Sequence, residues 1–202
     1  MTDAVNTSVE SSVKRIASLL QDSIDVKQRL LADKAMLSRI ADVAQSCVEA
    51  LQAKNKLLLA GNGGSASDAQ HIAAELVGRF ELERAGLPAM ALTTNASQLT
   101  ALSNDYGYEA VFSRQLQAFA KKGDVFFGLS TSGNSANIVA AAEVAKARGM
   151  IVIGMTGESG GKLDALCDIC LKVPSDNTAR IQEAHITIGH ILCALIEGAL
   201  VS

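Results

Sequence analysis

The chain has 202 residues, of which 49% are hydrophobic, and its formal net charge at pH 7 is −3. This balance, without any basic run, argues against a nucleic-acid-binding protein. We find no apolar run near the roughly 18 residues that a membrane span requires, and the N-terminus lacks the basic start and apolar core of a signal peptide. The sequence therefore predicts a cytoplasmic protein with neither nucleic-acid nor membrane partners.

The N-terminal quarter of the chain predicts helices and no strand. Apolar residues recur at intervals of three and four from about Asp3 to Ala53, which is typical of amphipathic helices, and Asp33 is placed to cap the second of two. A minimal sheet domain needs less helix than this. We therefore expect residues 1–54 to pack against another subunit; the alternative is that they only cover the sheet of their own chain.

Residues 55–202 alternate between short apolar runs and helical patterns, which is typical of βαβ units and a parallel sheet. The predicted strands are Lys56–Ala60, Pro88–Leu92, Val125–Leu129, Met150–Thr156 and Asp168–Val173. The predicted helices are Ser67–Phe80, Ala96–Asn104, Glu109–Lys121, Ala136–Arg148, Leu163–Leu166 and Thr178–Val201. We therefore predict an α/β fold in which helices flank a five-stranded parallel sheet, with an N-terminal helical extension.

The four cysteines do not form a disulfide framework in a chain of this length. Cys167 and Cys170 match a C-x-x-C pattern, but no second pair completes a zinc site. Their context, residues 168–173, looks like a short strand, where residues three apart point to opposite faces. We therefore expect both to be core residues, in line with the preference of free cysteine for burial.

A glycine-rich turn after the first predicted strand is the first candidate for a binding site. Gly61, Gly63 and Gly64 allow the backbone to turn sharply and to approach a ligand closely. Ser65 or Ser67 can cap the helix that follows, and the free N–H groups at its start suit an anion.

Two further polar turns follow predicted strands or helices. Residues 130–135, with the sequence STSGNS, place four hydroxyls and a glycine at the start of a helix, where they suit a phosphate monoester better than they suit simple capping. Asn104 and Asp105 lie in the other turn, where they either bind sugar hydroxyls or only shape the backbone. Neither glycine-containing loop matches a P-loop or a Rossmann fingerprint, so a nucleoside triphosphate or dinucleotide is not expected.

His71 and Glu75 lie one turn apart on one face of the helix after the glycine turn. They are open to three interpretations, namely a surface pair, two metal ligands or an acid–base pair. Their neighbours are small and apolar, so a charge there would be partly buried. All three histidines of the chain lie in this helix and the last one, which contains Gln182, Glu183, His185 and His190.

Together these motifs resemble the phosphoheptose isomerases, which are sugar-isomerase (SIS) domain proteins. The resemblance covers essentially the whole chain and rests on the glycine turn with His71 and Glu75, residues 104–107, 130–135, 157–162 and 180–185, and His190. It implies a flavodoxin-like three-layer fold and a homotetramer. It also implies the interconversion of sedoheptulose 7-phosphate and glycero-manno-heptose 7-phosphate, the first step of ADP-heptose and lipopolysaccharide core biosynthesis.

The resemblance further implies which residues form the site. The phosphate is expected on Ser130, Thr131, Ser132 and Ser135. The rest of the sugar phosphate is expected on Asn62, Gly63, Gly64, Ser65, Glu75, Asn104, Asp105 and Gln182. One zinc ion per subunit is expected on His71, Glu75, Gln182 and His190, with Glu75 and His190 as the acid–base residues. Some members carry an acidic residue before the RIQ motif, where this chain has Thr178 and Ala179, so a substrate contact there stays open.

Helix geometry adds a constraint to the implied zinc site. Gln182 and His190 are separated by about 12 Å of rise and about 80° around the helix. We therefore expect one ligand to come from a neighbouring subunit, or one to be indirect at a given moment. Two other functions stay open: a non-catalytic SIS module that senses a sugar phosphate or associates with a replication initiator, and an isomerase of another sugar phosphate. The presence of both Glu75 and His190 favours the enzyme.

Overall fold

The computed structural model describes the backbone of residues 2–201 and the burial of residues 8–201. Its centre is a five-stranded parallel sheet made of β1 (Leu57–Ala60), β2 (Ala89–Ala91), β3 (Val125–Leu129), β4 (Ile151–Thr156) and β5 (Ile169–Lys172). The strand order is β2-β1-β3-β4-β5, which is the flavodoxin-like order, and its direction of winding changes between β1 and β3. The predicted sheet is confirmed.

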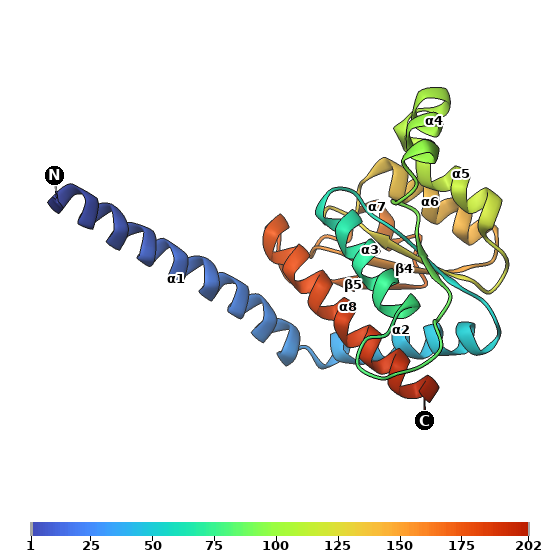
Figure 1. Cartoon of the computed structure of the whole chain (residues 1–202), viewed down its shortest axis with the longest axis horizontal. Helices are drawn as coiled ribbons and strands as arrows, with labels where there is room; N and C mark the ends of the chain where they lie inside the picture. Colours follow the sequence, from blue (N-terminus) through green and yellow to red (C-terminus); the bar gives the residue numbers. More distant parts are fainter. Residues whose placement is uncertain (1, 202) are drawn as a thin grey trace.

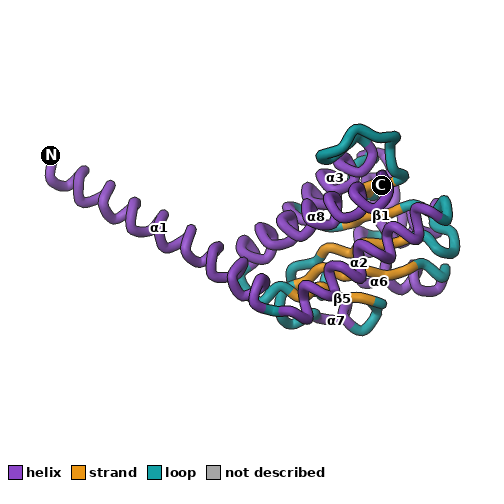
Figure 2. Tube along the Cα trace, turned by 90° about the horizontal axis from the view of Figure 1, so that it is seen from below, coloured by secondary structure: helices purple, strands orange, loops and turns teal. Residues whose placement is uncertain are grey.

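The helices cover both faces of this sheet (Figure 2). They are α1 (Thr2–Ala32), α2 (Lys34–Gln52), α3 (Gly64–Val77), α4 (Ala96–Tyr106), α5 (Val111–Phe119), α6 (Ala136–Ala147), α7 (Gly161–Asp164) and α8 (Thr178–Val201), with a 3-10 turn η1 (Tyr108–Ala110) before α5. Asp33 caps α2 as predicted, because its Oδ1 accepts a hydrogen bond of 3.0 Å from the Met36 amide.

Alternate residues of the strands enter two separate cores. Leu57 and Leu59 of β1 pack into the core shared with α2, α3 and α8, whereas Leu58 and Ala60 pack against α5 and α6. All four are at most 1% exposed. Strands buried on both faces explain why β1 is a continuous apolar run rather than an alternating one.

The N-terminal segment divides into two helices with different surroundings. α2 buries Met36, Ile40, Val43 and Cys47 in the same core as the sheet, so this helix covers its own chain. α1 extends away from the body of the protein (Figure 1). Its apolar stripe is left uncovered, with exposed fractions between 38% and 61% at Val9, Val13, Ile16, Leu19, Leu20 and Ile24. The expected packing of α1 against another subunit stays a prediction.

The last helix, α8, is more apolar than the sequence inspection allowed. By length and composition alone it could cross a membrane, and 44% of its most apolar window is buried inside the protein. Ile181, Ile188, Leu192 and Ile196 are at most 2% exposed and lie in the core with α2 and α3. Burial on several sides accounts for the apolar composition of a central helix.

Several predicted bounds differ from the observed ones by one to three residues, and two of these differences concern candidate residues. α3 begins at Gly64, three residues before the predicted start, because Gly63 takes a positive φ of 55° and lets the helix begin earlier. β5 begins at Ile169, one residue after its predicted start, and Cys167 precedes it, so strand alternation does not relate the two cysteines. The sulfur atoms of Cys167 and Cys170 both lie beside Gly154, and both residues are only partly buried.

Candidate active site

The loops that follow β1 and β3 meet at the point where the sheet changes its direction of winding. The side-chain amides of Asn62 and Asn137 hydrogen-bond to each other in both directions at 2.9 Å. The Tyr108 hydroxyl donates to the same Asn62 oxygen at 3.0 Å. The glycine turn and the serine-rich loop, which the sequence placed 70 residues apart, therefore adjoin at the edge where such sheets bind ligands.

The glycine turn brings the backbone of α3 close to α8. A Cβ added to Gly64 would lie 2.6 Å from the Gln182 Nε2 atom, so a larger residue there would displace the Gln182 amide. Gly63 is the N-cap of α3, and no side chain among the described residues caps this end. The expected capping by Ser65 or Ser67 is therefore wrong, since both serines already lie inside the helix.

The serine-rich loop of residues 130–135 is organised by its own hydroxyls. The Oγ atoms of Ser130 and Ser135 are 2.9 Å apart, and Ser132 Oγ accepts from the Asn134 amide at 3.1 Å. Gly133 takes a φ of 66°, and a Cβ there would lie 1.9 Å from the Gly160 carbonyl oxygen. The tight contact with the loop after β4 holds the hydroxyls at the start of α6.

Thr131 and Ser132 line a hollow of about 150 Å³ beside this loop. The same hollow is lined by Glu158 and Asp176. Two carboxylates repel an anion, so a phosphate on this loop would lie away from Glu158 and Asp176. Ser130 and Ser135 are not among the residues that line this hollow.

His71, Glu75 and His190 form a compact cluster between α3 and α8. His71 Nε2 lies 3.1 Å from Glu75 Oε1 and 3.2 Å from His190 Nε2. The side chains of His71 and Glu75 are 48% and 28% exposed, so a solute can reach them. The sequence left their use open, and the structure joins them to a histidine 115 positions after Glu75 in the chain.

The donor atoms of this cluster fit a metal ion. Among residues 2–201, these three side chains form a group of histidine and acidic residues that is close enough to hold a metal ion. Their potential ligand atoms all lie within 4.8 Å of one another. Four ligands at zinc-bond length around a tetrahedron lie about 3.3–3.5 Å apart, close to the distances above. The Nε2 atoms of His71 and His190 face each other, so at most one of them can carry a proton on that side. A cation bound between them would accept the lone pairs of both nitrogens.

Gln182 lies further along the same pair of helices. Its amide packs against Gly64, seven residues before His71, which is ~10 Å along the helix axis. Ile72 packs against Gly189 beside the two histidines, at the far end of this interval. The placement agrees with the expectation that Gln182 and His190 do not reach one ion simultaneously in a single chain, and a role for Gln182 as ligand stays a prediction.

A buried carboxylate fixes the far end of this helix pair, and the sequence analysis missed it. Glu197 on α8 is 1% exposed and accepts hydrogen bonds from the amides of Phe80, Glu81 and Leu82 at 3.0, 2.6 and 2.7 Å. Its ion pair with Arg84 Nε measures 2.9 Å. This network holds the Phe80 ring stacked on His190, with 5.6 Å between ring centroids.

Arg84 ties the same network to α3. Its guanidinium donates to the carbonyl oxygens of Glu75, Leu76 and Gly78 at 2.8–3.1 Å, which satisfies the C-terminal carbonyls of that helix. Nothing in the local pattern of the Arg84 segment indicates its ion pair with Glu197, because that partner is more than 100 residues away.

Comparison with known proteins identifies the family. A family model described as SIS domain matches residues 21–157. The phosphoheptose isomerase of Aneurinibacillus thermoaerophilus is 59% identical over 92% of this chain and 93% of its own length. The phosphoheptose isomerase of Roseiflexus sp. (strain RS-1) is 52% identical over 97% and 98%.

Solved structures give the same result. The phosphoheptose isomerase of Francisella tularensis matches with a TM-score of 0.89 at 40% identity, covering 93% of this chain and 98% of that one. The protein from Neisseria gonorrhoeae matches with a TM-score of 0.86 at 45% identity, covering 92% and 98%. The chain belongs to the phosphoheptose isomerase family of SIS domain proteins.

Three other predicted or candidate residues of this SIS domain protein lie outside the cluster. Asn104 and Asp105 are exposed near the end of α4 and hydrogen-bond to each other at 2.9 Å. His185 is fully buried with Nε2 3.2 Å from the Thr156 carbonyl oxygen, and burial lowers its pKa to about 4 despite that bond. His185 is therefore a neutral core residue.

Asp68 is an acidic residue of α3 that the sequence analysis did not single out. It lies one turn before His71, and burial raises the pKa of its carboxyl to about 6, although the His71 charge opposes the shift. Its position on the helix places a second, weaker acid beside the cluster.

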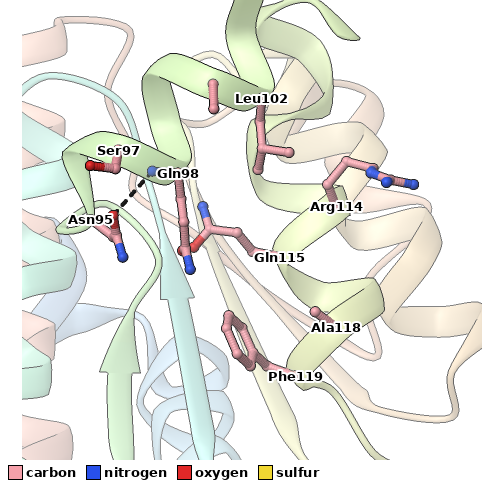
Figure 3. Close-up of a pocket in the computed structure, with 9 residues that line it drawn as sticks. Asn95, Ser97, Gln98, Leu102, Arg114, Gln115, Ala118 and Phe119 are labelled. Atoms are coloured by element: carbon pink, nitrogen blue, oxygen red, sulfur yellow. Dashed lines mark hydrogen bonds between the residues drawn. The ribbon is translucent and has the colours of Figure 1, made fainter. Parts of the chain in front are cut away.

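A larger pocket of about 470 Å³ lies between α4 and α5 (Figure 3). Arg114 is the charged residue of its lining, and its guanidinium stacks 4.5 Å from the Tyr106 ring centroid. Gln115 points into the sheet edge and donates to the Leu92 carbonyl oxygen at 3.0 Å. This pocket has no acid–base pair among its described lining residues, so it is not suited to moving a proton.

Proposed function

We propose that this protein is an aldose–ketose isomerase that interconverts sedoheptulose 7-phosphate and glycero-manno-heptose 7-phosphate through an enediol(ate). The observation that carries the proposal is the convergence of His71, Glu75 and His190 within 4.8 Å, on α8 and on the helix that follows the glycine turn. The name and high identity of the curated relatives support the same substrate.

Glu75 and His190 supply the acid–base chemistry in this proposal. Moving a carbonyl between C1 and C2 requires a base that takes a proton from the carbon beside the carbonyl and returns it to the neighbouring carbon. Glu75 is partly exposed and ionisable, which suits that base, and His190 serves the substrate oxygens. Glu75 has two carboxylate oxygens, so contact of Oε1 with His71 leaves the other oxygen for the proton.

We further propose one zinc ion per subunit as the cofactor. His71, Glu75 and His190 would hold it, with Gln182 as the fourth ligand from a neighbouring chain or after a local rearrangement. A zinc ion bound there would polarise the substrate carbonyl and stabilise the negative oxygen. The chemical type and spacing of the three donors support this choice of metal.

The phosphate is proposed to bind Ser130, Thr131, Ser132 and Ser135 at the start of α6, with the sugar along Asn62, Gly63, Gly64 and Ser65. The hydrogen bonds that join Asn62 to Asn137 support this path, since they connect the serine-rich loop to the glycine turn. Binding the phosphate at one end holds the reacting end in place. Asn104, Asp105, Glu75 and Gln182 complete the proposed substrate contacts.

The assembly proposed is a cytoplasmic homotetramer that acts in ADP-heptose and lipopolysaccharide core biosynthesis. The exposed apolar stripe of α1 supports packing between subunits, because Val13, Ile16 and Leu20 are each more than half exposed in a single chain. We keep the division into residues 1–54, for assembly, and 55–202, for catalysis, as a proposal with α2 shared between them.

An isomerase assay on purified protein tests the function. Sedoheptulose 7-phosphate is supplied with and without zinc, beside hexose and pentose phosphates, and aldose formation is followed. The proposal expects turnover of the heptose phosphate above the others. No turnover in the presence of zinc would instead favour a sensor of sugar phosphates or a module that associates with a replication initiator, and preference for a shorter sugar would reassign the substrate.

A further inference from the structure

Cys167 and Cys170 form a thiol pair on the opposite side of the sheet from the histidine cluster. A Cβ added to Gly154 in β4 would lie 2.6 Å from Cys167 Sγ and 3.1 Å from Cys170 Sγ, so both sulfurs occupy the space that this glycine leaves. The two thiols lie within hydrogen-bond reach of each other. Glycine inside a buried strand is otherwise unfavourable, and the pair explains its presence.

The two thiols have different surroundings. Cys170 lines a hollow of about 330 Å³ together with two cations, Arg39 and Lys172, and three carboxylates, Asp42, Asp164 and Asp168, so a small neutral solute such as a peroxide reaches it. Cys167 Sγ donates to the Leu163 carbonyl oxygen at 3.1 Å. The hydrogen bond between the thiols lowers the pKa of Cys170 and raises that of Cys167, which favours the thiolate on the member that lines the hollow.

The other two cysteines provide a contrast inside the same chain. Cys47 and Cys193 are both 0% exposed in the core between α2 and α8. Burial raises the pKa of Cys193 to about 12 and that of Cys47 further still. They lack both access and thiolate character.

We propose that Cys167 and Cys170 are a peroxide-reactive dithiol that closes to an intramolecular disulfide, with Cys170 as the attacking and Cys167 as the resolving sulfur. The pair is independent of the proposed isomerase chemistry. It gives the protein an oxidisable site in the hollow lined by Arg39 and Lys172.

The reaction balances with a hydroperoxide as the oxidant. The Cys170 thiolate attacks one oxygen of hydrogen peroxide, the O–O bond breaks, and the departing hydroxide takes up a proton to become water. Cys167 sulfur then attacks the sulfur of the Cys170 sulfenic acid, the S–O bond breaks, and the second hydroxide takes the Cys167 proton. Two thiols and one peroxide give one disulfide and two waters.

The test uses the full-length protein treated with dilute hydrogen peroxide, then unfolded and alkylated. We expect titratable thiols to fall from the four of the reduced chain to two, with a peptide containing the Cys167–Cys170 disulfide lighter by two hydrogens. Cys47 and Cys193 should be alkylated before and after treatment alike. Cys167→Ser should stop at a sulfenic acid that dimedone traps on Cys170, and Cys170→Ser should leave Cys167 reduced.

Three results would overturn the proposal. The first is that all four cysteines are still alkylated after peroxide treatment. A peptide with a free low-pKa thiol, placed in the same tube, serves as the control that the peroxide is active. The second is a disulfide or oxidised product at Cys47 or Cys193 in preference to the pair. The third is trapping of sulfenic acid on Cys167 in Cys170→Ser at the rate seen on Cys170 in Cys167→Ser. The near-isosteric serine variants should keep the melting temperature of the reduced protein, which excludes misfolding as the cause.

Discussion

Replacing Glu197 by glutamine should destabilise the protein strongly, although the shape of the side chain is kept. The carboxylate is 1% exposed, accepts three backbone N–H groups and pairs with Arg84, whose side chain is 6% exposed. Glu197→Gln removes the charge and leaves the Arg84 cation buried without its partner. Breaking a buried pair from one side costs about 3–5 kcal/mol. For a chain of this size that corresponds to a fall of about 6–20 °C in melting temperature.

The matched control is Glu83→Gln in the same connection between α3 and β2. Glu83 pairs with Arg79 at 3.5 Å, but their side chains are 88% and 60% exposed. An exposed pair contributes at most about 1 kcal/mol. Urea unfolding and thermal melts of both variants and wild type, at one protein concentration, measure the difference. Equal losses in the two variants would refute the inference that the Glu197 network holds α3 and α8 together.

Three further outcomes follow from the same structure. Burial raises the pKa of Glu197, but the three amides and Arg84 outweigh it and hold the pKa at about 2, below its ordinary 4.5. A carboxylate whose pKa is lowered on folding stabilises the folded state above its unfolded pKa, and this contribution is lost as the pH falls to the folded pKa. Between pH 4.5 and 2, the unfolding free energy of wild type should therefore fall more than that of Glu197→Gln, as measured by denaturant titration at each pH. Ser135→Ala removes the hydroxyl paired with Ser130 and should raise KM about tenfold with a smaller change in kcat, whereas a larger effect on kcat would place the phosphate elsewhere. Gly64→Ala should displace Gln182 and weaken zinc binding in a chelator competition, while Gly198→Ala, whose added Cβ meets nothing within 4 Å, should not.

Most of the fold follows from local patterns in the sequence. Each strand of a doubly wound sheet is an apolar run, and the bounds of β3 and α8 are those predicted from such patterns. The predictions fail where one residue decides a boundary. Gly63 starts α3 early by taking a positive φ.

The site was only partly predictable, because the local sequence pattern shows how residues are spaced along one helix but not which residues of another helix pack against them. His71 and Glu75 could be placed on one face, but their contact with His190 depends on how α3 and α8 pack. The roles of Asn137 and Glu197 depend on partners more than 70 residues away. Motif resemblance supplied His190, and no sequence signal supplied the carboxylate that supports it.

The most direct test of the account is the kcat of Glu75→Gln and His190→Gln on sedoheptulose 7-phosphate, beside wild type and the exposed control Glu83→Gln. All four proteins are assayed with saturating zinc, and bound metal and melting temperature are recorded. The account predicts that each site variant loses about 10²–10⁴-fold in kcat while Glu83→Gln keeps the wild-type rate. Folded site variants that turn over the substrate as fast as wild type would contradict it.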